Sequence, residues 1–319
     1  MEIEEIKILG EKIKQNINKV IIGKSEVIDV MLTAMIAGGH VLLEDVPGTG
    51  KTVIAKTLSK SIGATFKRVQ FTPDLLPSDL TGINYYNQKL GEFTFRSGPI
   101  FTNILLGDEI NRATPRTQSS LLECMEEKQV TIDGKTHILD KPFFVIATQN
   151  PVETQGTFNL PEAQLDRFLV KLNMGYPSIE EGKQIMQRFI INNPLEELEE
   201  VCSKEELNDA SRSISKVHVS DDIQEYILKI VEGTLNHDSV VLGVSPRGSL
   251  AILRACQVYA ALKGKSFVSP QDVKILCPYV FSHRIILKDN LKFRGVTNVS
   301  VIQELLATID VPTEEWAKR

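Results

Sequence analysis

The chain lacks the features that would mark a disulfide-stapled, zinc-binding or membrane-spanning protein. Its 319 residues contain only four cysteines, and no two of them form a Cys-x-x-Cys pair; they are Cys124, Cys202, Cys256 and Cys277. Cysteines so widely spaced predict neither a zinc site nor a disulfide framework. No apolar run approaches the ~20 residues that cross a bilayer, and the acidic, amphipathic start of the chain is unlike a secretory signal. We therefore expect a cytoplasmic protein without membrane insertion.

Positive charge is also in short supply. The chain has 36 Lys and Arg against 41 Asp and Glu, a net charge of -5, and no dense basic run. Nucleic-acid binding depends on clustered cations that neutralise phosphates, so we do not expect a nucleic-acid partner. The 42% hydrophobic content is ample for a packed core, and the length favours two domains.

The most informative feature that is present is a glycine-rich turn between an apolar run and a helix. It comprises Asp45, Val46, Pro47, Gly48, Thr49, Gly50, Lys51 and Thr52, with Val53 following in the helix. In such turns several backbone N–H groups point at one anion, a lysine reaches the terminal phosphates, and a threonine hydroxyl holds a metal ion. The helix that starts near Lys51 adds the positive end of its dipole. The turn predicts a nucleoside-triphosphate site, the alternative being a chance glycine turn.

Asp45 departs from the phosphate-loop pattern, which starts with glycine at this position. Aspartate tolerates unusual backbone angles better than most residues. We therefore expect the turn to form with Asp45 in place.

Short apolar strands alternate with helices in the first half of the chain. We expect strands over 40–44, 66–70, 103–108, 143–148 and 168–172, and helices over 25–37 and 51–62. This alternation predicts an α/β fold with a parallel sheet covered on both faces. Two β-hairpins are expected as inserts, over 83–95 and over 129–139, the second turning at Asp133-Gly134.

Beyond Pro177 the pattern becomes helical. Helices are expected over 179–191, 221–235, 246–262 and 270–280, with an acidic connector over 193–200. We therefore predict an α/β nucleotide-binding domain over 1–192 and an all-helical domain over 193–319.

Two adjacent carboxylates, Asp108 and Glu109, end the apolar strand over 103–108. An aspartate in this place holds Mg²⁺, directly or through water, and a neighbouring glutamate polarises the attacking water as general base. Taken alone, the pair also fits an ordinary strand that ends in solvated acids. Its occurrence together with a phosphate loop favours the catalytic interpretation.

Asn150 follows the fourth expected strand, so it comes to the same carboxyl edge of the sheet. There it could hydrogen-bond the γ-phosphate and orient the water. A simple Asn-Pro turn is the alternative.

Two arginines are further candidate site residues. Arg167 stands just before the fifth strand, and Arg247 lies in the first turn of the 246–262 helix. A cation at a helix N-terminus opposes the dipole by roughly several tenths of a kcal/mol, so a bound phosphate would account for Arg247. A surface salt bridge remains an alternative for either arginine.

Taken together, these motifs resemble the MoxR family of AAA+ ATPases over nearly the whole chain. The matching stretches are 45–52, 70–82, 107–127, 129–134, 143–168 and 245–255, of which 143–168 is highly specific to the family. The resemblance implies an AAA+ P-loop sheet in the strand order 5-1-4-3-2, two hairpin inserts and a helical lid.

The resemblance also implies a role for each candidate residue. Lys51 and Thr52 would be Walker A residues, and Asp108 and Glu109 would be Walker B residues, with Thr52 and Asp108 holding Mg²⁺. The remaining roles follow from the same resemblance: Asn150 as sensor 1, Arg247 as sensor 2 on the lid, Arg167 as the arginine finger that reaches the neighbouring subunit's nucleotide, and Ile22 and Gly23 in the adenine pocket.

Members of this family are chaperone-like motors that form hexameric rings and work with proteins carrying von Willebrand factor A domains. The resemblance therefore implies a Mg²⁺-dependent ATP hydrolase that remodels partner proteins as a homo-oligomer. The preference for ATP over GTP rests on this resemblance alone. A DNA-processing motor of the same clade, a metal-chelatase motor subunit and a nucleotide-gated scaffold that hydrolyses little remain alternatives.

Overall fold

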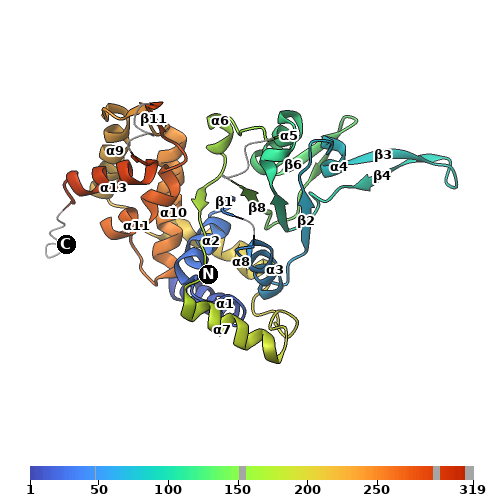
Figure 1. The fold of residues 1–319 in the computed structure, drawn as a ribbon, viewed down its shortest axis with the longest axis horizontal. Helices are drawn as coiled ribbons and strands as arrows, with labels where there is room; N and C mark the ends of the chain where they lie inside the picture. Colours follow the sequence, from blue (N-terminus) through green and yellow to red (C-terminus); the bar gives the residue numbers. More distant parts are fainter. Residues whose placement is uncertain (47, 151–155, 290–294, 313–319) are drawn as a thin grey trace.

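The computed structural model of the protein describes residues 1–46, 48–150, 156–289 and 295–312. A five-stranded parallel sheet in the order β2-β5-β8-β1-β9 forms its centre (Figure 1). The strands are β1 (Val41–Glu44), β2 (Phe66–Gln70), β5 (Ile104–Asp108), β8 (Phe144–Gln149) and β9 (Val170–Leu172). Numbered among themselves, they stand in the order 5-1-4-3-2, which confirms the predicted sheet.

Both faces of this sheet are apolar, so its strands are continuous hydrophobic runs rather than alternating ones. Val41, Leu43 and Ile104 point to one face, where α1 (Ile3–Asn18), α2 (Ser25–Ile36) and α3 (Lys51–Ser61) cover them. Leu42 and Leu105 point to the other face, which α5 (Pro115–Glu127) covers. The edge strand β2 is less buried than its neighbours.

Both predicted hairpins are present. The first comprises β3 (Gly82–Asn87) and β4 (Glu92–Ser97), follows the short helix α4 (Pro77–Thr81), and extends well away from the body of the molecule (Figure 1). The second comprises β6 (Gln129–Ile132) and β7 (Lys135–Ile138). Its turn residues Asp133 and Gly134 have φ values of 48° and 78°, as a two-residue type I′ turn requires.

The C-terminal part of the chain is helical, as predicted. Its helices are α7 (Ile179–Ile191), α8 (Lys204–Ser213), α9 (Asp221–Asn236), α10 (Pro246–Leu262), α11 (Pro270–Phe281) and α13 (Asn298–Thr308). Two features were not predicted as elements: the helices α8 and α13, and a small antiparallel pair of β10 (Val240–Leu242) and β11 (Ile286–Leu287). The short elements α6 (Glu162–Leu165), η1 (Ile110–Arg112) and η2 (Ile214–Lys216) complete the described structure.

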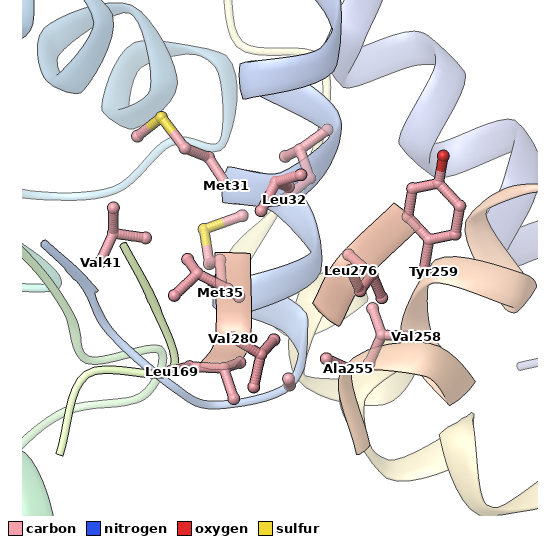
Figure 2. Close-up of a cluster of buried hydrophobic side chains, with 14 of the residues drawn as sticks. Met31, Leu32, Met35, Val41, Leu169, Ala255, Val258, Tyr259, Leu276 and Val280 are labelled. Atoms are coloured by element: carbon pink, nitrogen blue, oxygen red, sulfur yellow. The ribbon is translucent and has the colours of Figure 1, made fainter. Parts of the chain in front are cut away.

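Helix α2 joins the sheet to the helical part through one hydrophobic core. Figure 2 shows Met31 and Met35 of α2 between Val41 on the sheet side and Leu276 of α11. Because this core continues across the predicted domain boundary at 192/193, the boundary stays a prediction. Within the described ranges, none of the helices combines the length and the apolar character that a bilayer crossing needs.

Candidate active site

The phosphate loop connects the carboxyl end of β1 to the first turn of α3. Gly48 and Gly50 adopt φ values of +86° and +89°, a region that side-chain-bearing residues rarely enter. A Cβ atom on either glycine would project into open space. The loop thus leaves room beside its backbone for an anion, at the positive end of α3.

The Lys51 ammonium closes over this loop. It donates hydrogen bonds to the backbone carbonyl oxygens of Asp45 and Val46, at 2.9 and 3.2 Å. The Thr49 hydroxyl donates to the same Val46 oxygen at 3.3 Å. The amine is therefore already held at the mouth of the loop, where a phosphate would exchange for the carbonyl oxygens. Pro47, also predicted to bind nucleotide, lies outside the described residues.

Asp45 fits the loop for a different reason from the one predicted. Its backbone is not among the described residues with positive φ, so tolerance of unusual angles does not explain it. Instead the buried carboxylate accepts three backbone N–H bonds, from Val46 at 2.9 Å and from Met174 and Gly175 at 3.1 Å each. The side chain thus ties the start of the phosphate loop to the segment after β9.

A pocket of about 400 Å³ opens in front of the loop. Most of the predicted nucleotide and metal residues gather here, together with two side chains of β2. The lining residues are Gly48, Gly50, Lys51, Thr52, Val53, Arg68, Gln70, Asp108, Glu109 and Asn150. The phosphate loop, the paired acids and the Asn150 amide therefore converge on one cavity at the carboxyl edge of the sheet, as predicted.

A threonine on β8 organises the paired acids. The Thr148 hydroxyl donates to the Asp108 carboxylate at 2.6 Å and accepts the Glu109 backbone N–H at 2.8 Å. Glu109 itself has a left-handed backbone, with φ at 56°. The strained turn separates the two carboxylates, so that each faces its own set of partners.

Side chains that the sequence analysis did not single out hold these carboxylates. Arg68 of β2 forms an ion pair with Asp108, at 2.6 Å. The Gln70 amide donates to the Glu109 carboxylate at 2.8 Å, and the Arg112 guanidinium pairs with it at 3.1 Å. Because β2 and β5 are parallel with Gln70 opposite Asp108, strand pairing alone brings Arg68 and Gln70 to the acids.

Ile22 and Gly23 are not among the residues that line this pocket. Gly23 lies against α7, and a Cβ atom there would overlap the Glu181 carboxylate at 1.7 Å. The adjacent Lys24 ammonium donates to the Tyr176 carbonyl oxygen at 3.4 Å. The segment from Met174 to Glu181 thus connects the phosphate loop with the predicted adenine-binding residues, whose role stays a prediction.

Arg167 and Arg247 lie together in a different pocket, of about 290 Å³. Arg247 pairs there with Glu126 of α5. No described residue of the phosphate loop lines this pocket. Arg167 precedes β9, which runs parallel to β1 with Val170 opposite Val41, so Arg167 belongs to the amino edge of the sheet while the phosphate loop leaves the carboxyl edge.

A buried arginine of the helical part fixes this second pocket. Arg284 donates from Nε to the Asp166 carboxylate at 2.6 Å and from its terminal nitrogens to the Phe168 and Leu169 carbonyl oxygens at 2.8 and 3.1 Å. Burial lowers the pKa of Arg284 to about 10, although Asp166 opposes the shift. The Ser245 hydroxyl also donates to Asp166, at 3.2 Å, so the residue beside Arg167 anchors the helical part.

Comparison with known proteins agrees with this architecture. The profile of the ATPase family associated with various cellular activities matches residues 40–170, and that of the AAA lid domain matches residues 232–305. A crystal structure from Cytophaga hutchinsonii, of a protein given there as a candidate ATPase, superposes with a TM-score of 0.90 at 36% identity, over 97% of this chain and 98% of that one.

Sequence relatives decide the family. An uncharacterized Bacillus subtilis protein, YeaC, is 50% identical over 99% of both chains. Chaperone MoxR1 of Mycobacterium tuberculosis is 38% identical over 93% of this chain and 80% of its own length. The chain belongs to the MoxR family of AAA+ ATPases.

As a MoxR-family AAA+ ATPase, the chain is a nucleotide-binding, chaperone-like enzyme that hydrolyses ATP. The residues present also fit a magnesium ion. The Thr52 hydroxyl and the Asp108 carboxylate face the same pocket, and hard oxygen donors of this kind, completed by nucleotide phosphates and water, are what Mg²⁺ prefers. When bound there, the ion would neutralise charge that develops on the phosphates.

Proposed function

We propose that this MoxR-family ATPase is a Mg²⁺-dependent homo-oligomeric motor, with each ATP held between two subunits, that remodels partner proteins. The roles proposed within one subunit follow from its pocket. Lys51 and the loop backbone would bind the phosphates, Thr52 and Asp108 the metal ion, Glu109 would activate water, and Asn150 would orient it.

The observation that carries the proposal is the separation of the arginines from the phosphate loop. A four-residue strand such as β1 spans about 13 Å, and Arg167 and the loop belong to opposite ends of the paired strands β9 and β1. Arg167 is therefore poorly placed to serve the nucleotide of its own subunit. A head-to-tail ring, in which one subunit's amino edge faces its neighbour's loop, would bring it to a phosphate.

Arg247 shares the pocket of Arg167, so we place both arginines on the same contact with the neighbouring subunit. In the structure its partner is Glu126, and both side chains are partly exposed. An exposed pair of this kind contributes little, about 0–1 kcal/mol. Exchanging Glu126 for a phosphate would therefore be easy.

The partner-directed part of the proposal draws on the β3–β4 hairpin. It extends from the body of the molecule (Figure 1) and exposes several large apolar side chains, of which Tyr86, Leu90 and Phe93 are the most accessible, by 55%, 64% and 74%. Exposed apolar groups on a projecting element mark a contact surface. A partner with a von Willebrand factor A domain is the candidate that the family resemblance supports, and hexameric ring size belongs to the same proposal.

Complementation between two inactive variants tests the shared site. Lys51→Ala removes the phosphate-binding amine and Arg167→Ala the arginine. Each alone should hydrolyse ATP very slowly, whereas an equimolar mixture should recover activity, because roughly a quarter of randomly formed heterologous contacts pair an intact loop with an intact arginine. The specific activity of the parent should also rise with protein concentration.

Two results would contradict the shared site. The first is an Arg167→Ala protein that hydrolyses ATP at the parental rate. The second is a mixture that stays inactive while the parental activity is independent of protein concentration. Nucleotide binding by Arg167→Ala, measured by titration calorimetry, serves as the control for folding.

A further inference from the structure

A second cavity, of about 450 Å³, lies at the amino edge of the sheet, between the end of α2, the loop before β8, and the helices α8 and α10. Four cationic side chains line it: Lys128, Lys141, Arg212 and Arg254. No carboxylate from the described part of the chain lines it. We call this cavity the basic pocket. Its volume is within the roughly 300–1,000 Å³ of small-molecule sites.

Two of the cations are held in place by neutral acceptors. The Lys128 ammonium donates to the Gly38 carbonyl oxygen at 3.2 Å, and Arg254 donates from Nε to the Ala37 carbonyl oxygen at 2.8 Å. These carbonyls terminate α2, whose C-terminal dipole favours positive charge. The dipole favours the two cations beside it, but the C-terminal end of a helix carries only about half of a negative elementary charge.

The other two cations, Lys141 and Arg212, add positive charge beyond what the dipole of α2 can offset. Lys141 stands in the loop before β8, and Arg212 lies on α8, where it pairs with Asp209 at 3.2 Å. That pair is largely exposed, with both side chains more than half accessible, and such pairs are weak. Arg212 is therefore free to turn to a stronger anion.

The electrostatics of Lys128 show that the positive charge is not balanced. Its pKa is lowered by burial, and further by repulsion from Lys141 and Arg254, although Glu126 acts in the opposite direction. A bound anion would relieve this repulsion, since an opposite charge favours the ionised form of a lysine.

The remaining lining identifies the class of ligand. Ser211 and Ser215 bring hydroxyl groups, Asn208 brings an amide, and Pro142 and Phe143 form an apolar wall. Hydroxyl, amide and cationic groups can all donate hydrogen bonds to phosphate oxygens, and an apolar wall can pack against the non-phosphate part of an organic ligand. We propose that the basic pocket binds a phosphorylated small molecule that carries two or more phosphate groups.

Such a ligand would tie together parts of the chain that are far apart in sequence. Lys128 and Lys141 flank the β6–β7 hairpin of the sheet region, whereas Arg212 and Arg254 belong to the helical part. Ligand binding at their junction would oppose separation of the two parts and raise the unfolding temperature. Lys128 and Arg254 also line the pocket of Arg167 and Arg247, whereas Lys141 and Arg212 line the basic pocket alone. The proposal is therefore tested independently of the proposed motor function at Lys141 and Arg212.

Calorimetric titration with inorganic tripolyphosphate, at low ionic strength, tests the proposal. The Lys51→Ala protein serves as the background, because it lacks the amine that would bind the probe at the phosphate loop. We expect binding to persist in this background and to weaken at least tenfold on adding Lys141→Gln and Arg212→Gln. Inorganic phosphate should bind more weakly than tripolyphosphate, because it engages fewer of the cations.

A charge-matched control separates the pocket from the net charge of the protein. Lys183→Gln and Lys229→Gln remove two exposed lysines outside the pocket and should leave the affinity unchanged. Should Lys51→Ala fail to fold, the parent saturated with a non-hydrolysable ATP analogue takes its place. Absence of tripolyphosphate binding overturns the proposal, as does an equal loss in the two double variants. Binding of poly-glutamate but not of tripolyphosphate would overturn it in favour of an acidic protein segment.

Discussion

The two edges of the central sheet carry different kinds of site. At the carboxyl edge, Lys51, Asp108 and Glu109 face one pocket and are held by short hydrogen bonds from within the α/β region. At the amino edge, Arg167 and Arg247 share a pocket with residues of the helical part, and Asp166 and Arg284 join the two parts. The first pocket contains the residues proposed to bind nucleotide within one subunit. The second pocket contains the residues that we propose contact the neighbouring subunit. The comparison teaches that one fold can place its phosphate loop and the arginines proposed to contact phosphate at opposite edges of the same sheet.

The largest effect should come from the carboxyl edge. Glu109→Gln keeps the size of the side chain but removes the carboxylate proposed to activate water, so we expect kcat to fall by about 10²–10⁴-fold while ATP still binds. Steady-state hydrolysis and an equilibrium nucleotide titration measure the two properties separately. Hydrolysis at the parental rate would show that Glu109 is not the base. The carboxyl edge would then no longer be distinguished from the amino edge by a catalytic base.

At the amino edge, Asp166→Ala should act through stability first. It leaves the Arg284 guanidinium buried without its carboxylate partner, and breaking such a pair destabilises a protein by about 3–5 kcal/mol. Urea unfolding followed by circular dichroism measures the change. Glu225→Ala is the matched control, because it breaks the exposed Glu225–Lys229 pair and should leave the free energy of unfolding nearly unchanged. Similar losses in both variants would contradict a special anchoring role for Asp166.

Acidification should lower the free energy of unfolding through a buried histidine at the amino edge. His40 lines the arginine pocket, donates from Nε2 to the Met125 carbonyl oxygen and accepts the Val145 N–H at Nδ1, and burial lowers its pKa to about 4. The unfolded chain protonates this histidine near pH 6.5, whereas the folded chain does so only near pH 4. The contribution of His40 to the free energy of unfolding is therefore fully present above pH 6.5 and declines toward pH 4, by about 3 kcal/mol in all.

Denaturant unfolding between pH 7.5 and pH 4.5 measures this decline. His283, also buried, has its pKa lowered in the same direction, by burial and by Arg284, and adds to the effect. If a His40→Gln protein loses stability on acidification as steeply as the parent, His40 is not responsible.

The smallest effect should follow from Gln70→Ala. The Gln70 amide holds the Glu109 carboxylate, and losing one such bond, about 0.5–1.5 kcal/mol, should free the base and raise kcat by about two- to five-fold with KM unchanged. Gln224→Ala, at an exposed position on α9, serves as the control. A fall in kcat would show that Gln70 positions Glu109 instead of restraining it.

Much of the fold could be predicted because the relevant signals are local. Strands β1, β5 and β8 are continuous apolar runs, and the bounds of α7 and α10 follow from their serine caps. Helix α8 carries the same signal, since Ser203 and Glu206 form a capping box, so its first turn can also be identified from the sequence. The β10–β11 pair is short, and its paired residues are at least 44 positions apart in the sequence, a separation that no local pattern reveals.

The site was predictable to the extent that its chemistry lies in contiguous motifs. Lys51, Thr52, Asp108 and Glu109 belong to such motifs, and their convergence follows from parallel strand order. Arg68 reaches Asp108 across a strand pairing, and Arg284 reaches Asp166 across 118 positions of sequence. These partners depend on register and on domain packing, so spacing alone could not identify them.

Asp45 bears on how phosphate loops are recognised in other sequences. A search pattern that demands glycine at this position would pass over the chain, although the residue there needs no glycine backbone and instead accepts three N–H groups through its carboxylate. The glycines that the geometry does demand are Gly48 and Gly50, because of their positive φ angles. A better pattern would score each position by the backbone conformation that it requires, and would accept a carboxylate where backbone amides need an acceptor. Such a pattern would find phosphate loops that a strict consensus misses.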